Sequence, residues 1–250
     1  MKHPGNLWSI INQQLTAFMS AQSTCEWCLG GLDSSQRFLC HSCQQQLPHN
    51  LLACSQCAEP AAVADMRRCG RCQRRPPAFE YASTAFTYEA PIDRWVLRCK
   101  DQHSLHWHDR LNQLTRSHFA PPAVMPDAVT FIPSSRYKRL RRGFNLSESL
   151  AASVALCIDR PLLSLFQLQA QQDQRGLSVA QRHANLQHSL QCLPPSALPD
   201  VSEFGHILVV DDIMTSGATM HRAAQLLKQR GVKLVGCWAL ARATKSRPAT

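Results

Sequence analysis

The chain has 250 residues, of which 44% are hydrophobic, and its formal net charge is +10 with histidine counted as neutral. This length suits one medium domain and one small domain, and no apolar run approaches the roughly 20 residues that a membrane-spanning helix needs. The composition therefore argues against an integral membrane protein, and the positive charge favours anionic partners.

The N-terminal segment, residues 1–22, is partly apolar between Leu7 and Phe18 but is interrupted by three polar residues. It lacks the continuous apolar core of a signal peptide and is typical of a short amphipathic helix. We therefore expect a cytoplasmic protein with no membrane span.

Eight of the twelve cysteines form four Cys-x-x-Cys pairs, and the second two pairs repeat the first two at an offset of 29 residues. The spacing within each half is close to that of a zinc ribbon. Two Cys-x-x-Cys turns together complete a tetrahedral site of four thiolates. We predict two structural Zn²⁺ sites, one formed by Cys25, Cys28, Cys40 and Cys43 and the other by Cys54, Cys57, Cys69 and Cys72.

Other uses of these cysteines fit the pattern less well. A thioredoxin-like redox centre needs one pair between a strand and a helix, and a disulfide framework needs an oxidising compartment. Four thiolates close a zinc site, so we expect no catalysis at these metals. The remaining cysteines are isolated and fit buried or free thiols; they are Cys99, Cys157, Cys192 and Cys237.

Pro76 and Pro77 follow the cysteine region and predict a domain boundary between residues 78 and 79. Residues 80–88 alternate as a strand does, and Pro91 suits the first turn of a following helix. Three histidines come next, without a spacing that predicts a metal site, and we expect them in a solvated loop; they are His103, His106 and His108.

A second strand is predicted over residues 128–132, and a strongly cationic segment follows it. Five of the seven residues from Arg136 to Arg142 are Lys or Arg. We expect this segment to be a loop at the carboxyl end of the strand, where ligands bind in open α/β sheets. It could neutralise pyrophosphate, hold a nucleic-acid backbone, or be an ordinary solvated loop. A helix over residues 146–157 follows, with Asn145 and Glu148 as its expected capping box.

The C-terminal part alternates strands and helices, which predicts a parallel α/β sheet. Residues 174–187 are mostly polar and are interpreted as a mobile loop that leads into a short helix. A buried strand over 207–210, a helix from Met220 to about Arg230 and a strand over 233–241 complete the pattern.

The most informative residues lie between the 207–210 strand and its helix. Asp211 and Asp212 end the strand, and five small residues, 215–219, open the helix. Backbone N–H groups at a helix start bind anions, whereas two carboxylates suit hydroxyl groups. A phosphate site beside a hydroxyl-binding acid pair predicts a ribose-5-phosphate ligand. The alternative is an ordinary strand-turn-helix with a capping Asp; neither a Walker motif nor a Gly-x-Gly-x-x-Gly motif is present.

This segment resembles the phosphoribosyl-pyrophosphate (PRPP) loop of type I phosphoribosyltransferases. The resemblance implies that Asp211 and Asp212 hold the ribose hydroxyls. It also implies that the loop backbone holds the 5′-phosphate through Thr215, Ser216, Gly217, Ala218 and Thr219.

The whole chain resembles the ComF family of competence and DNA-utilisation proteins, also called GntX. The matches are the cysteine pairs, Arg142 to Asn145, Arg175 to Ser178 with Ala180 to Leu186, and Val209 to Thr219. The family implies a double zinc ribbon over 23–78 and a type I phosphoribosyltransferase-like parallel sheet over 79–250. It also implies a role in taking up or using external DNA.

Three departures from the family pattern concern the pyrophosphate side of the site more than the ribose-phosphate side. Ile132 to Arg136 read Ile-Pro-Ser-Ser-Arg where the family usually has Pro-Val-Pro-Leu-His. Leu146 stands in place of a Gln, and Arg182-His183 in place of an Arg pair.

Two functions remain open, with a pure scaffold as a third. As an enzyme, the chain would transfer a phosphoribosyl group with Mg²⁺, using Asp211, Asp212 and Arg136 for catalysis and Ser134 and Ser135 as further ligand contacts. As an inactive adaptor, it would bind PRPP or a nucleotide and contact single-stranded DNA or a DNA-translocating helicase. The expected DNA contacts are Lys138, Arg139, Arg141 and Arg142.

Overall fold

The computed structural model describes residues 24–61, 67–169, 189–194 and 200–244, and the chain divides into two compact units, Met1–Leu47 and Pro48–Thr250. The helix expected within residues 1–22 and the loop and helix expected over 174–187 lie outside the described residues.

The described part of the first unit is built around the first cysteine repeat. The N–H of Cys25 donates to the carbonyl of Gly30 over 2.7 Å, which closes the first Cys-x-x-Cys turn. The short helix α2, His41–Gln45, begins directly after Cys40, the first cysteine of the next pair.

The second unit contains the second cysteine repeat together with the sheet. Helix α3, Gly70–Arg74, begins directly after Cys69, as α2 does after Cys40. Cys54, Cys57 and Cys72 share one buried cluster with side chains of the sheet. The domain boundary predicted between residues 78 and 79 stays a prediction.

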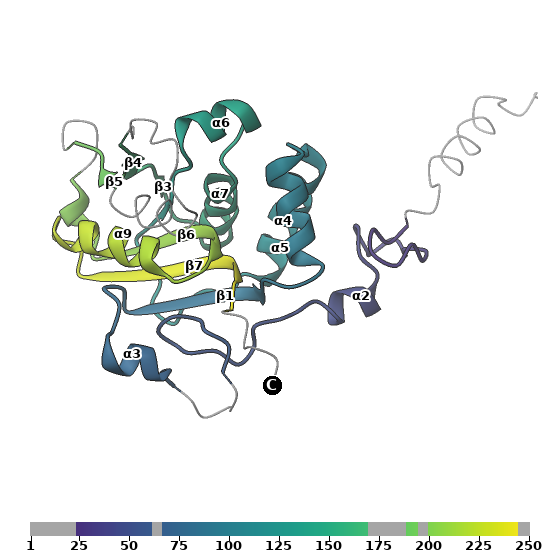
Figure 1. Ribbon diagram of the computed structural model, residues 1–250, viewed down its shortest axis with the longest axis horizontal. Coiled ribbons are helices and arrows are strands. Elements are labelled where there is room, and N and C mark those ends of the chain that lie inside the picture. The colour runs from purple at the N-terminus through teal and green to yellow at the C-terminus, as the bar shows by residue number, and fades with distance from the viewer. Residues whose placement is uncertain (1–23, 62–66, 170–188, 195–199, 245–250) are drawn as a thin grey trace, which may run out of the picture. The chain divides into compact units, whose positions relative to one another are not determined.

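The sheet has five parallel strands in the order β1-β7-β6-β2-β3, which confirms the predicted parallel α/β class (Figure 1). Each predicted strand is present, and β6 extends through the acid pair. The strands are β1 Tyr81–Thr87, β2 Ala128–Phe131, β3 Leu162–Leu163, β6 His206–Met214 and β7 Leu234–Arg242.

Helices cover both faces of this sheet. Ile207 and Val209 of β6 share a buried cluster with α9, and the alternate residues Leu208 and Val210 face the other side, where α7 packs. Figure 1 shows α9 in front of the sheet and α7 behind it. No helix among the described residues is long and apolar enough to cross a membrane. Besides α3, the α-helices described in the second unit are α4 Ile92–Asp101, α5 Leu105–His118, α6 Arg136–Arg142, α7 Leu146–Ile158 and α9 Ala218–Lys228.

A small antiparallel pair, β4 Phe166–Leu168 and β5 Leu190–Cys192, lies outside the main sheet. A short 3₁₀ helix, η2 Val201–Glu203, precedes β6. Neither was predicted from the sequence.

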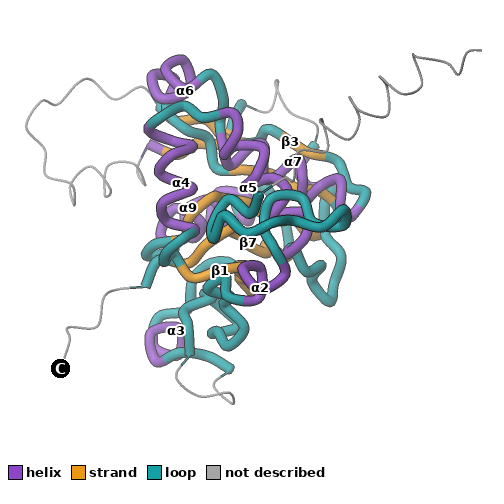
Figure 2. Tube along the Cα trace, turned by 90° about the vertical axis from the view of Figure 1, so that its right-hand side faces the viewer, coloured by secondary structure: helices purple, strands orange, loops and turns teal. Residues whose placement is uncertain are grey.

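The expected solvated histidine loop is wrong, because most of it is helix α5. The hydroxyl of Ser104 accepts from the N–H of Trp107 over 3.3 Å and caps the helix. Trp107 stacks on Trp95 of α4 with ring centroids 5.2 Å apart, so the two helices lie side by side (Figure 2). His108 donates to or accepts from Ser149 over 2.7 Å instead of facing solvent.

Two expectations around the cationic segment are also corrected. The segment is helix α6 and not a loop; Ser135 accepts from the N–H of Lys138 over 3.4 Å at its start, and Gly143, with φ 81°, ends it. Asn145 does take the N-cap position of α7, but its side chain makes no capping bond. The amide of Asn145 donates to the carbonyl of Ile132 over 3.5 Å, so the capping box with Glu148 is wrong.

Candidate functional site

A cavity of about 310 Å³ lies at the carboxyl ends of β2 and β6. Its walls come from α4, the β2–α6 connection, the start of α7 and the β6–α9 connection. This is the edge of a parallel sheet at which open α/β proteins bind ligands. The cavity therefore joins segments that the sequence separates by more than a hundred residues, and it is the candidate site.

The acid pair lies in this cavity, and its two carboxylates are held differently. Oδ1 of Asp211 accepts from the hydroxyl of Ser147 over 2.8 Å and from the N–H of Asp212 over 2.9 Å. Burial and the neighbouring charge of Asp212 raise the pKa of Asp211 to about 7. Asp211 therefore holds a proton more readily than an exposed carboxyl group does.

Lys100 of α4 neutralises Asp212, the other member of the pair, although no sequence motif points to this lysine. Its Nζ lies 2.8 Å from Oδ1 of Asp212. Burial alone lowers the pKa of Lys100, but the attraction of Asp212 outweighs it and the pKa is raised overall. Lys100 therefore stays protonated at neutral pH and contributes a positive charge to the cavity wall.

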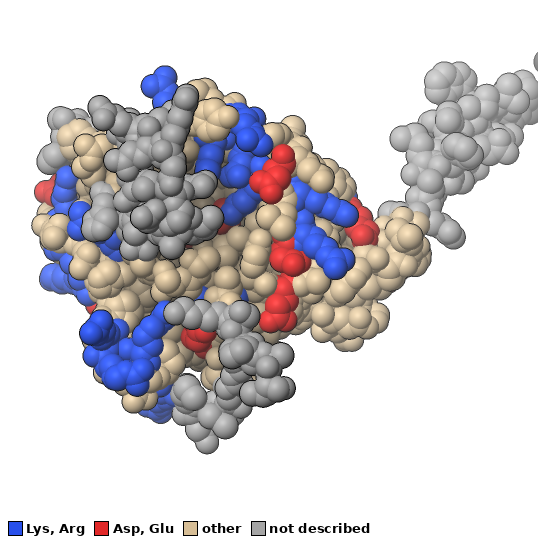
Figure 3. All heavy atoms as spheres, in the orientation of Figure 1, with Lys and Arg blue, Asp and Glu red and all other residues tan. Residues whose placement is uncertain are grey.

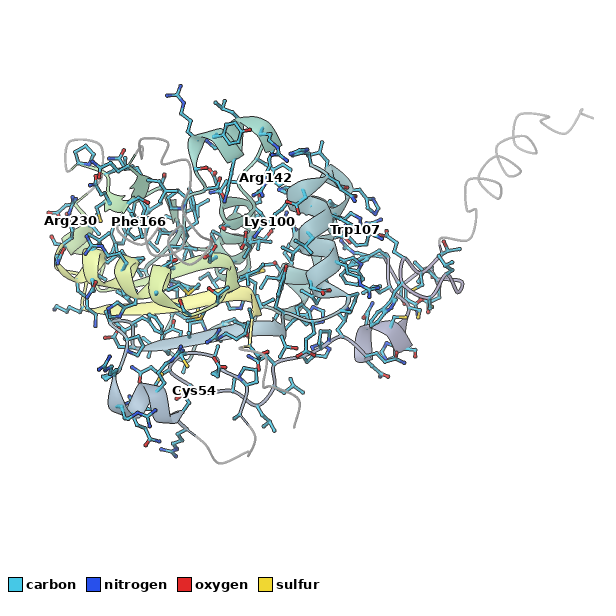
Figure 4. All side chains as sticks on the ribbon, in the orientation of Figure 1. Cys54, Lys100, Trp107, Arg142, Phe166 and Arg230 are labelled. Carbon is cyan, nitrogen blue, oxygen red and sulfur yellow. The ribbon has the colours of Figure 1, made fainter. Side chains whose placement is uncertain are left out.

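Two cations of α6 also face the cavity. Lys138 and Arg142 are four residues apart, so they lie on one face of the helix, and both line the cavity. Arg142 lies 3.9 Å from Asp101 at the end of α4, and Figure 4 shows Arg142 and Lys100 coming from these two elements. Burial and the nearby charges of Arg142 and Lys100 lower the pKa of Lys138, which is the effect of cations gathered in one place.

The segment 215–219 begins at the end of β6, and α9 starts at Ala218, two residues before the predicted start. The backbone N–H groups of Ser216 and Gly217 have no acceptor among the described residues. Gly217 has φ 78°, and a Cβ at that position would lie 2.8 Å from the Met214 side chain. The turn thus needs glycine, and it leaves N–H groups free at a helix start, as an anion site requires.

The structure brings most of the predicted ligand contacts together, but not all. Arg136 is exposed and does not line the cavity, and the predicted contacts Ser216, Gly217 and Ala218 do not line it either. Arg139 and Arg141, which we expect to contact DNA, also lie outside it. Ser134 lines it with a buried hydroxyl that has no hydrogen-bond partner among the described residues. The predicted residues that line the cavity are Ser134, Ser135, Lys138, Arg142, Asp211, Asp212, Thr215 and Thr219.

The exposed side of α6 carries the other cations. Figure 3 shows Lys and Arg side chains gathered over α6 and the adjoining end of α4, with acidic side chains beside them. Arg141 donates through Nε to Nε2 of His103 over 3.4 Å. The helix therefore divides the segment into a face toward the cavity and a face toward solvent.

The eight paired cysteines form two separate clusters, each able to hold a metal ion. Within each cluster the four sulfur atoms lie within 4.8 Å of one another. Sγ atoms of Cys28 and Cys40 are 3.7 Å apart, and those of Cys57 and Cys69 are 3.6 Å apart. These distances match the edge of about 3.8 Å in a tetrahedral zinc site with Zn–S bonds of about 2.3 Å. The N–H of Cys69 donates to Sγ of Cys54 over 3.2 Å, which stabilises a thiolate there.

Comparisons with known proteins agree with this architecture. A family model described as a phosphoribosyl transferase domain matches residues 140–249. The chain is 27% identical over 232 residues to competence protein F of Haemophilus influenzae, which covers 88% of this chain and 96% of that protein. It is 26% identical over 238 residues to DNA utilization protein YhgH of Salmonella typhimurium, which covers 90% and 99%. These matches and the two cysteine clusters confirm the resemblance to the ComF family.

Two of the solved structures that match part of this chain have TM-scores below 0.5. An allosteric regulatory enzyme of purine biosynthesis is 20% identical with a TM-score of 0.35 and covers 53% of this chain, but the match spans only 25% of that protein. Orotate phosphoribosyltransferase from Aeropyrum pernix is 17% identical with a TM-score of 0.33, covering 56% of this chain and 62% of that one.

Proposed function

We propose that this chain binds PRPP or another ribose-5-phosphate compound and acts, as a ComF-like protein, in the uptake or use of external DNA. One observation carries the ligand: the acid pair, Thr215 and Thr219 of the β6–α9 connection, and three cations line one cavity of about 310 Å³. The names of the relatives support the biological role.

Each part of the ligand has a matching group. A 5′-phosphate would accept from the N–H groups at the start of α9 and from the hydroxyls of Thr215 and Thr219. The ribose hydroxyls would donate to Asp211 and Asp212. A pyrophosphate group would lie against Lys100, Lys138 and Arg142, the three cations that line the cavity.

This arrangement suits phosphoribosyl transfer. In that reaction the bond between C1 of the ribose and the pyrophosphate oxygen breaks, pyrophosphate leaves with the electron pair, and a nitrogen nucleophile bonds to C1 and loses a proton. The three cations would stabilise the negative charge that develops on the leaving group, and Arg136 would have to move inward to share this role. The acid pair supplies hard oxygen donors that fit Mg²⁺, which would neutralise pyrophosphate when bound.

A second function, contact with single-stranded DNA, is favoured by the outer face of α6. None of the seven residues of α6 is buried. Tyr137 and Leu140, which lie between cations along the helix, are 72% and 74% exposed. Arg139 and Arg141 could neutralise phosphates, and Tyr137 could stack on a base. An adaptor of this kind would also fit a helicase partner that moves DNA.

The two sites of four cysteines are proposed to hold structural Zn²⁺. None of the twelve cysteines, all within the described residues, forms a disulfide, and thiolate ligands persist in a reducing compartment such as the cytoplasm.

Incubation with PRPP, Mg²⁺ and a panel of nucleobases separates the enzyme from the adaptor. Pyrophosphate release that depends on one base would establish transfer. PRPP binding with no release under any base would favour the adaptor, and failure to bind PRPP or ribose 5-phosphate would contradict the proposal as a whole.

A further inference from the structure

Arg242, the last residue of β7, is a buried cation that joins two functional segments. It is 1% exposed. Its guanidinium donates to the carbonyls of Met214 over 2.9 Å and of Thr215, both at the start of the phosphate loop, defined here as residues 214–219. It also donates to the carbonyl of Cys57 over 3.0 Å and to the carboxylate of Glu59, both in the second cysteine repeat.

The bonds on the loop side fix the direction of backbone N–H groups. In a trans peptide the C=O and the following N–H point in opposite directions. Because the carbonyl of Thr215 is turned toward Arg242, the N–H of Ser216 is turned away from it. The same holds for Met214 and the N–H of Thr215. Arg242 thus holds two peptide units in the orientation that leaves N–H groups available to an anion.

The hydrogen bonds from Arg242 to Cys57 and Glu59 depend on the second four-cysteine site. Cys57 is one of the four sulfur ligands, and Glu59 follows it by two residues. The N–H of Cys54 donates to the carbonyl of Glu59 over 2.8 Å, so the turn that carries Glu59 closes on another ligand residue. The position of both acceptors is therefore set by the turn that wraps the metal.

Apolar packing also connects the second cysteine repeat with the phosphate loop. Cys54, Cys57 and Cys72 share one buried cluster with Phe79 and Met214. The second cysteine repeat and the phosphate loop are thus parts of one core.

We propose that the second four-cysteine site, acting through Arg242, holds the phosphate loop in its ligand-binding shape, so that metal at this site controls ligand affinity. The inference rests on the proposed function for its ligand, PRPP. Without the metal, the turn at Cys57 and Glu59 would relax, and Arg242 would lose acceptors that a buried guanidinium needs. The guanidinium would then bond to other acceptors or to water. The carbonyls of Met214 and Thr215, which it holds in the metal-bound protein, would change direction as well. Arg242 is a positioning residue here and does not touch the ligand.

The two cysteine clusters provide a matched pair of variants, tested in the full-length protein. Cys72→Ser removes a ligand of the second site, and Cys43→Ser makes the same change in the first. Both should lower the zinc content from two ions to one. Hydrogen exchange of the amides in residues 214–219 should accelerate about tenfold or more in Cys72→Ser alone, and PRPP affinity by calorimetry should fall about tenfold in the same variant.

A second pair of variants keeps the test decisive if Cys72→Ser fails to fold. Glu59→Gln leaves all eight cysteines in place and removes one charged acceptor of Arg242, whereas Glu203→Gln makes the same change at an exposed position of η2. Glu59→Gln should speed exchange in residues 214–219 without loss of zinc, and Glu203→Gln should not.

The inference is overturned if amide exchange in residues 214–219 is equally fast in Cys72→Ser and Cys43→Ser. It is also overturned if Glu59→Gln and Glu203→Gln show the same exchange rates there. Should the wild type bind no PRPP, the proposed function fails, and the exchange rates alone then decide whether the second site supports the loop.

Discussion

Nζ of Lys100 lies 2.8 Å from a carboxylate oxygen of Asp212, and the two side chains are only 19% and 15% exposed. A pair this shielded from solvent is held strongly, and loss of one partner leaves a buried charge uncompensated. The ion pair places a positive charge beside the acid pair that we expect to hold the ribose, so it offsets one of the two carboxylate charges that an anionic ligand meets.

Lys100→Met should weaken PRPP binding by roughly 10- to 100-fold, since a hydrogen bond or ion pair to a charged group contributes about 1.5–3 kcal/mol. Calorimetry measures this directly. Lys228→Met is the matched control, because Lys228 is ion-paired with Glu80 away from the cavity. Equal losses in the two variants would show that Lys100 has no special part in binding.

The acid pair should also make stability depend on pH. The pKa of Asp211 is raised from 3.8 to about 7, first by burial and then by the charge of Asp212. Between these values the folded state binds more protons than the unfolded state, so the free energy of unfolding falls as pH rises from about 4 to about 7. The total change is on the order of 2–4 kcal/mol.

Asp211→Asn isolates this effect, because Asn keeps the shape and an acceptor for Ser147 but does not titrate. Urea denaturation at several pH values should show that the wild type loses stability relative to Asp211→Asn as pH rises. A difference between the two proteins that does not vary with pH would mean that the pKa of Asp211 is not raised.

Purified protein should contain two zinc ions per chain. Cys54→Ser should contain one and should melt at a lower temperature, because structural zinc contributes folding free energy. Elemental analysis and thermal denaturation check both, with Cys157→Ser, a change at an exposed cysteine of α7, as the control. Less than one zinc per chain in the wild type would contradict the assignment.

The two faces of α6 should separate in function. Arg139→Ala with Arg141→Ala should reduce the log-log salt slope for single-stranded DNA by about 1.4, at roughly 0.7 for each phosphate no longer neutralised. Lys138→Ala with Arg142→Ala should act mainly on PRPP affinity. If the first pair leaves the slope unchanged, the assignment of DNA to the outer face is wrong.

Local patterns made a large part of this structure predictable. Four apolar residues before Asp211 predicted β6, and the small residues after Asp212 predicted the turn into α9. The cysteine repeat predicted both clusters because the ligands of each lie within a short segment. In these cases the residues that form the structure or the site are close together in the sequence.

Long-range contacts were not predictable in this way. Lys100 sits on an amphipathic helix among other charged residues, and only the packing of α4 brings it to Asp212, 112 positions later. Arg242 looks like one more cation of a basic C-terminal segment, although it is buried and satisfied by backbone carbonyls. The charge of residues 136–142 favours a solvated loop, whereas Ser135 and Gly143 are typical helix-capping residues and the segment is in fact helix α6.

Calorimetry with the double variant Asp211→Asn, Asp212→Asn decides whether Asp211, Asp212 and the phosphate loop form a PRPP site. Wild type should bind PRPP, and the double variant should bind it more weakly by roughly 2–4 kcal/mol, because two charge-assisted hydrogen bonds are lost. A folded double variant with unchanged affinity for PRPP would show that the ligand binds elsewhere.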